Sequence, residues 1–176
     1  MLSKQFSPYL KEFVYGGIDG SVTTFAIVAG ATGAGLSPGV IIVLGFANLI
    51  ADGFSMSVGN YLSTESAYRS EHIEQDDPGF RSPYRTALAT FCSFVLMGLA
   101  PLVVYVLSYL DLLTEVDLFA TSCTLTMLAF LFIGFLRSHV TDTSKLKSMA
   151  ETFLLGGIAA LLAYFVGTTL ENMLLR

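Results

Sequence analysis

The stretch FANLIADGFSMSVGNYLS, residues 46–63, decides the fold because it is apolar enough to cross a bilayer and still carries polar side chains at a regular spacing. Four side chains with possible ligand atoms recur in it at steps of four: Asn48, Asp52, Met56 and Asn60. Four residues exceed one full turn of an α-helix by about 40°, so these side chains form one slowly winding stripe. A carboxylate in the middle of a membrane helix costs at least about 2.5–3.5 kcal/mol, so Asp52 should face protein or water. A carboxylate, two amides and a thioether on one helix face indicate a path for a cation.

The composition is that of a membrane protein. The chain has 176 residues, of which 53% are hydrophobic and 13% are charged, with a mean hydropathy of +0.67. A soluble domain usually has about 25% charged residues, so the charge content is too low for one. The net charge is −5, and no basic cluster indicates a nucleic-acid partner. Cys92 and Cys123 lie in apolar runs and are expected to be small buried residues, not a disulfide or a metal-binding pair.

Hydropathy predicts an all-α membrane domain, residues 1–176, with five spans of about 20 residues each. The expected spans are 13–34, 38–63, 84–109, 119–137 and 149–170. Residues 64–83 form a short acidic connector, and Pro101 is expected to kink the third span. The first residues contain no removable signal peptide, so the first apolar segment should remain as a span.

The basic residues orient the bundle. Eight of them lie at connectors that the positive-inside rule assigns to the cytosol, whereas the remaining loops are neutral or acidic. These eight are Lys4, Lys11, Arg69, Arg81, Arg85, Arg137, Lys145 and Lys147. The N-terminus is therefore predicted to be cytosolic and the C-terminus, with Arg176, to be on the other side.

The first span carries a second carboxylate, Asp19, among Gly16, Gly17 and Gly20. Glycines let membrane helices approach closely, and they loosen a helix locally. One interpretation is a tightly packed interface in which Asp19 accepts hydrogen bonds from Thr23, Thr24 or a neighbouring helix. The other is a functional role, which is the default for a carboxylate at membrane depth.

Three segments resemble the vacuolar iron transporter family. They are YGGIDGSVTTFAIVAGATGAG, ADGFSMSVGNYLS and the closing FLFIGFLRSHVTDTSKLKSMAETFLLGGIAALLAYFVG. The resemblance implies a homodimer of five-span subunits that moves Fe²⁺, often Mn²⁺, out of the cytosol in exchange for protons. It also implies that Asp19 and Met56 are the pathway aspartate and methionine, on a path along the dimer interface. Larger members insert a long glutamate-rich cytosolic domain between spans two and three, and this chain resembles a short form that lacks it.

The ligand chemistry is compatible with a divalent transition metal. Oxygen ligands alone would suit Mg²⁺, Ca²⁺ or Mn²⁺, and a thioether favours softer ions such as Fe²⁺. The predicted metal ligands are Asp19, Asp52, Met56, Asn48 and Asn60, although filling a gap in the apolar core is the usual role of a membrane methionine. Asp52 and Asp19 are also the predicted proton-coupling groups, because metal binding favours a carboxylate anion and would release a proton. No permanently bound cofactor is expected, since the metal is the transported substrate.

Acidic residues near the cytosolic face could gather cations at the mouth of the path. The candidates are Glu65, Glu71, His72, Glu74 and Glu151, with Asp76 and Asp77 beside them. The alternative is a solvated connector in which Glu65 pairs with Arg69 one helical turn away. Glu151 could equally be a favourable acidic residue in the first turn of the fifth helix.

Two other function classes are alternatives to a transporter. An intramembrane aspartyl protease also needs two carboxylates in neighbouring spans, but it pairs a YD with a GxGD motif, and here Ile18 and Ala51 precede the aspartates. A non-transporting scaffold would leave both buried aspartates without a use, and a silent Asp19→Asn substitution would favour it. We therefore predict a transporter and not an enzyme. Its membrane is the plasma (inner) membrane of a prokaryote, or a vacuolar or other endomembrane of a eukaryote.

Overall fold

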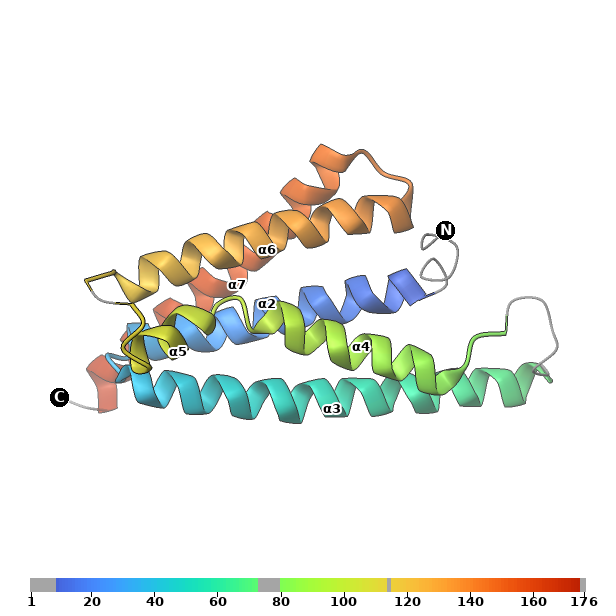
Figure 1. Ribbon diagram of the computed structural model, residues 1–176, viewed down its shortest axis with the longest axis horizontal. Helices are drawn as coiled ribbons and strands as arrows, with labels where there is room; N and C mark the ends of the chain where they lie inside the picture. The colour runs from blue at the N-terminus through green and yellow to red at the C-terminus, as the bar shows by residue number, and fades with distance from the viewer. Residues whose placement is uncertain (1–8, 73–79, 114, 175–176) are drawn as a thin grey trace.

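The computed structural model describes residues 9–72, 80–113 and 115–174, and within these ranges the chain is helical with no strand. The helices are α2 (Leu10–Gly33), α3 (Pro38–Glu71), α4 (Pro83–Gly98), α5 (Val103–Tyr109), α6 (Leu118–Thr141) and α7 (Lys145–Leu174), arranged as an elongated bundle (Figure 1). The all-α prediction is confirmed. Four helices, α2, α3, α6 and α7, are long and apolar enough to cross a membrane, so the protein is an integral membrane protein.

The predicted third span is broken in the middle. α4 and α5 meet at an angle of 58°, and together they are apolar enough to count as a fifth span. The break contains Pro101, whose ring prevents a continuous helix because it removes an N–H donor and clashes with the preceding turn. Ser122 of α6 donates a hydrogen bond to the Pro101 carbonyl oxygen at 2.6 Å, which satisfies a buried backbone acceptor at the break. The predicted kink is confirmed.

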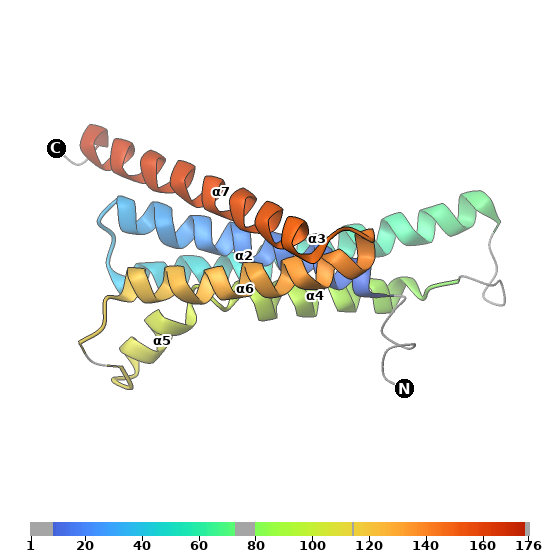
Figure 2. The ribbon, with the colours of Figure 1, turned by 90° about the horizontal axis from the view of Figure 1, so that it is seen from above.

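α2 runs through the middle of the bundle and contacts α3, α4, α6 and α7 (Figures 1 and 2). Glycines make this central position possible. A Cβ atom at Gly20 would overlap the Phe94 carbonyl of α4, and one at Gly167 of α7 would overlap the backbone of Gly30. Close backbone approach of this kind is how membrane helices gain packing contacts without a hydrophobic driving force.

α3 is longer than a bilayer requires. Its 34 residues span about 50 Å, whereas the hydrocarbon core is about 30 Å thick. The helix continues through residues 64–71, so the first part of the predicted connector is helical, and it ends at His72 in the left-handed conformation (φ 54°). The predicted pairing one turn apart is confirmed, because Arg69 Nη2 lies 2.7 Å from Glu65 Oε1.

Successive helices alternate in direction, so the described basic residues gather at one end of the bundle. This end holds the start of α2, the end of α3, the start of α4, the end of α6 and the start of α7, and the end of α7 lies opposite it (Figure 1). We call it the basic end. The cysteines are both free; Cys123 is half-buried but Cys92 is exposed, so the prediction that both are buried is wrong for Cys92.

Candidate metal path between α2 and α3

One hydrogen-bonded contact sets the register between α2 and α3. Asn48 Nδ2 donates to Thr23 Oγ1 at 3.4 Å and to Thr24 Oγ1 at 3.3 Å. The two helices are antiparallel, so one turn backwards along α2 and one turn forwards along α3 lead to Asp19 and Asp52, which occupy facing positions. The facing positions therefore form a ladder, and the aspartates lie one level nearer the basic end than Asn48.

The two aspartates have no partner within the described part of the subunit. Neither carboxylate takes part in an ion pair or a side-chain hydrogen bond there. The Thr23 hydroxyl bonds to the backbone oxygen of Asp19 at 2.8 Å, not to its carboxylate, so Thr23 does not satisfy the acid. Asp19 is half-buried and Asp52 is exposed on the surface of the subunit. Two like-charged groups that face each other in this way need a cation, a proton, water or a second protein surface.

A cavity of about 750 Å³ opens beside the next levels of the ladder, at the basic end. Tyr15 of α2 and Met56 of α3 both line it, and so does Asn60 one turn further along α3. Asn60 and Asp52 are eight residues apart, or about 12 Å along the helix axis. Met56 is half-buried and packs against the apolar core as well as lining the cavity. It can therefore fill space in the core and still be reached from the cavity.

The two asparagines are tied to threonines through their amide nitrogens. Asn60 Nδ2 donates to Thr90 Oγ1 of α4 at 2.6 Å, and Thr64 Oγ1 lies 3.3 Å from Asn60 Oδ1. Because the stripe winds around α3, Asn48 faces α2 while Asn60 faces α4. Metal ligation by an amide uses its oxygen, and the nitrogen contacts fix the orientation of each amide plane.

The residues predicted at the cytosolic mouth lie elsewhere than the cavity. Glu65 is paired with Arg69 on the surface of α3, and Glu71 and His72 are exposed at its end. Glu151 pairs with Arg137 at 2.8 Å and joins α7 to α6. Glu74 lies outside the described residues, as do Asp76 and Asp77.

Sequence reasoning missed Glu12, an acidic residue that does line the cavity. It precedes Asp19 by seven residues, which is close to two helical turns, so both lie on the same face of α2. That spacing was the available signal. Glu12 lies beside Lys11, just before an apolar run begins, and this position is instead typical of a solvated charge outside the membrane.

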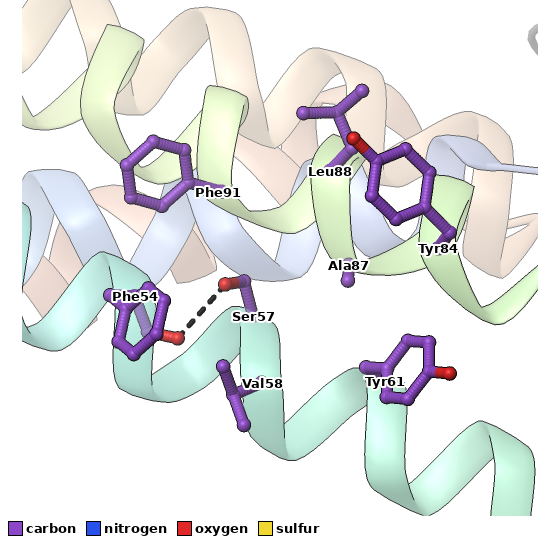
Figure 3. Close-up of a pocket in the computed structure, with 8 residues that line it drawn as sticks. All are labelled: Phe54, Ser57, Val58, Tyr61, Tyr84, Ala87, Leu88 and Phe91. Carbon is purple, nitrogen blue, oxygen red and sulfur yellow. Dashed lines mark hydrogen bonds between the residues drawn. The ribbon is translucent and has the colours of Figure 1, made fainter.

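Within the described ranges, no three His, Cys, Asp or Glu side chains are grouped closely enough to hold a metal ion. A second, smaller pocket of about 300 Å³ lies between α3 and α4, and its lining is apolar (Figure 3). The Ser57 hydroxyl, which lines this pocket, donates to the Phe54 carbonyl at 2.9 Å. The pocket is therefore not suited to an ion.

A family model described as the VIT family matches residues 10–77 and 67–168, which include the aspartates, Met56 and the cavity residues. The chain belongs to the VIT family.

Named relatives of this VIT-family chain cover most of its length. The vacuolar iron transporter of Toxoplasma gondii (strain ATCC 50861 / VEG) is 26% identical over 227 residues, with 94% of this chain and 75% of the relative covered. Vacuolar iron transporter 1 of Oryza sativa subsp. japonica is 23% identical over 220 residues, covering 93% and 86%. Vacuolar iron transporter homolog 4 of Arabidopsis thaliana is 26% identical over 166 residues, covering 89% and 81%. The homologues support a metal-ion transporter.

These alignments differ in length in an informative way. The alignment with the Toxoplasma protein extends over 227 residues although this chain has 176, so that relative has a segment with no counterpart here. The two matched parts of the family model meet around residues 67–77, which places the missing segment between α3 and α4. The alignment with homolog 4 is shorter than this chain, so it requires no such segment.

Proposed function

We propose that this protein exports Fe²⁺, Mn²⁺ or both from the cytosol in exchange for protons, along a path that begins at the basic-end cavity and passes Asp19 and Asp52. The observation that carries the proposal is the pair of facing aspartates, which have no partner among the described residues and lie one level beyond a partly polar cavity lined by Met56. The names of the relatives refer to iron transport and support the choice of substrate.

The donor atoms favour a transition metal over an alkaline-earth ion. Carboxylate and amide oxygens from Asp19, Asp52 and Asn60 would bind any hard divalent cation, whereas the Met56 thioether adds affinity for softer ones. In a cavity of this size the ion can keep part of its water shell while it first meets the protein. The thioether therefore favours Fe²⁺ over Mg²⁺ and Ca²⁺, and the oxygen ligands also suit Mn²⁺.

Proton exchange follows from the same carboxylates. A divalent ion stabilises the anionic form of a carboxylate, so loading the site displaces a proton and unloading it takes one up. Asp19 acts as the essential ligand and Asp52 as the additional proton site. At the next level Asn48 ties α3 to Thr23 and Thr24 of α2.

The path is shared by two copies in a homodimer of five-span subunits. Asp52 is exposed on a single subunit, and a charge facing lipid there would be costly. On α2 the half-buried residues Asp19, Val22 and Ala26 recur every three to four residues, which suits packing of this face against the same face of a second copy. A symmetric pair would supply four carboxylates and two thioethers to one path. With the basic end in the cytosol, transport runs outward or into an organelle.

Metal uptake by proteoliposomes tests this function. Purified protein is reconstituted with a metal-sensitive dye inside, and Fe²⁺, Mn²⁺, Co²⁺, Zn²⁺ and Ca²⁺ are supplied in turn with and without a pH gradient. We expect Fe²⁺ or Mn²⁺ uptake that the gradient accelerates and little Ca²⁺ uptake. Asp111→Asn, a substitution at the opposite end of the bundle, is the control and should transport normally. Absence of flux for every ion in folded dimers would reject a transporter and favour a scaffold.

A further inference from the structure

Glu12 is the one acidic side chain that the structure places in the wall of the basic-end cavity. Its side chain is only 13% exposed, and its two oxygens differ. Oε1 accepts from Arg81 Nη1 at 3.2 Å, whereas Oε2 is buried and has no hydrogen-bond partner within the described residues. A buried carboxylate oxygen without a partner carries a free-energy penalty, so it indicates a site that is filled in another state.

Arg81 comes from the segment before α4 and is held from two directions. Its backbone N–H donates to the Tyr68 hydroxyl on α3 at 2.8 Å. The neighbouring Phe80 ring packs on the Tyr68 ring with centroids 5.1 Å apart. The backbone of Arg81 is thereby fixed to the projecting end of α3, while its side chain, 41% exposed, reaches across the cavity to Glu12.

We infer that Glu12 is the first protein ligand for the divalent cation, and that the Arg81 guanidinium occupies this position as a tethered competitor when no metal is present. This inference rests on the proposed function and adds a site and its regulation to it. The ligand is a partly hydrated divalent cation, which meets Glu12 at the cavity wall and continues towards Met56 and the facing aspartates.

The geometry is better suited to an exchangeable contact than to a permanent structural pair. A structural arginine–carboxylate pair typically uses two parallel hydrogen bonds, but here a single guanidinium nitrogen contacts a single oxygen. A divalent ion can use both oxygens of Glu12 and carries twice the charge of the guanidinium. The displaced Arg81 side chain already reaches solvent, so releasing it costs little. Lys11 also lines the cavity. Its positive charge lies near both the metal and the displaced Arg81 side chain.

A matched pair of arginine substitutions separates this role from a general effect of charge. Arg81→Gln removes the competitor, and Arg69→Gln removes an equal charge from the same end of the bundle, where Arg69 pairs with Glu65 on the surface. Mn²⁺ binding to purified protein is followed by the loss of the free-ion EPR signal, and Mn²⁺ uptake is measured in proteoliposomes. We expect Arg81→Gln to lower the Kd and the KM for Mn²⁺ roughly threefold to fivefold, and Arg69→Gln to leave both unchanged.

Glu12→Gln completes the test. We expect it to raise the Kd for Mn²⁺ by about tenfold or more, and to cancel the effect of Arg81→Gln in the double variant, because the two side chains act on one site. Thermal unfolding is measured for each variant and also for Arg81→Lys. It identifies any loss of function that is due only to misfolding. An unchanged Kd in folded Glu12→Gln, or equal effects of the two arginine substitutions, would overturn the inference. Because binding is measured without transport, wild-type protein that binds Mn²⁺ through Glu12 but moves none would reject the proposed function alone.

Discussion

At the scale of single residues, Asp19 and Asp52 face each other but differ in their surroundings. Asp19 lies on the central helix and is half-buried, whereas Asp52 on α3 is exposed in the single subunit. In the proposed mechanism the more accessible carboxylate, Asp52, mainly exchanges protons with water, and the half-buried one on the central helix, Asp19, mainly ligates the metal.

Asp52→Asn tests that division. The substitution keeps the shape of the side chain and a hydrogen-bonding amide but removes titration. We expect metal binding to weaken by roughly tenfold, as for the loss of one charged ligand, and downhill metal flux to persist without acceleration by a pH gradient. Uptake is measured in proteoliposomes with the gradient imposed or absent. If Asp52→Asn still drives metal uphill on a proton gradient at the normal rate, Asp52 is structural and the proton site lies elsewhere.

The residues of the ladder could be predicted from the sequence better than their partners could. The spacing of four predicted the stripe on α3, and the cost of a buried charge singled out both aspartates. Periodicity carries no information about which helix faces each turn, so the threonine contacts of Asn48 and Asn60 were not foreseen. Glu12 was missed because its burial depends on Arg81, which is 69 residues away in the sequence.

At the scale of secondary-structure elements, α2 is held in the centre by glycines that leave no room for a side chain. Gly20→Ala would push a Cβ into the Phe94 carbonyl of α4, and backbone cannot move aside as a flexible side chain can. We expect a destabilisation of about 1–3 kcal/mol, typical of overpacking. Thermal unfolding in detergent measures it, with Gly157→Ala as the control because no atom lies within 4 Å of a Cβ there.

Gly157 lies in α7. Gly157→Ala should leave the stability of the protein unchanged or raise it slightly, since alanine is the better helix former. Equal loss of stability in both glycine variants would mean that helix flexibility, and not the contact between α2 and α4, gives Gly20 its importance.

The four unbroken spans could be predicted from hydropathy because each must be apolar over about 20 residues. The extent of α3 could not, since residues 64–71 are polar and hydropathy assigns them to a loop. The local signal was the spacing of Glu65 and Arg69, one turn apart on a continuing helix. The break in the third span was predictable from Pro101 alone, but the 58° bend depends on packing against α6.

At the scale of the whole molecule, the gathering of basic residues at one end predicts the orientation in the membrane. Single cysteines at Ser70, exposed near the end of α3, and at Val116, exposed before α6, are placed in a background without Cys92 and Cys123. In intact cells or right-side-out vesicles, an impermeant maleimide should label Val116→Cys only, and in inverted vesicles Ser70→Cys only. Labelling of both positions from the same side would rule out five spans.

The shared path predicts contact between the two copies of α2. Cysteines introduced one at a time at Val22 and Ala26, which are half-buried on the same face of α2 as Asp19, should form cross-linked dimers in membranes. Leu161→Cys on α7, a position that is 72% exposed and assigned to lipid, is the control and should not. Cross-linking only at Leu161, or monomers alone by mass measurement in detergent and in lipid, would contradict a path between subunits.

The central claim is that metal and protons are exchanged at the aspartates between α2 and α3. Metal-driven proton flux, recorded with a pH-sensitive dye in proteoliposomes and compared between wild-type protein and Asp19→Asn at equal dimer content, tests it most directly. The account predicts that adding Fe²⁺ or Mn²⁺ to wild-type vesicles moves protons in the direction opposite to the metal, and that Asp19→Asn abolishes both fluxes. Proton-coupled metal flux of normal size in Asp19→Asn would contradict it.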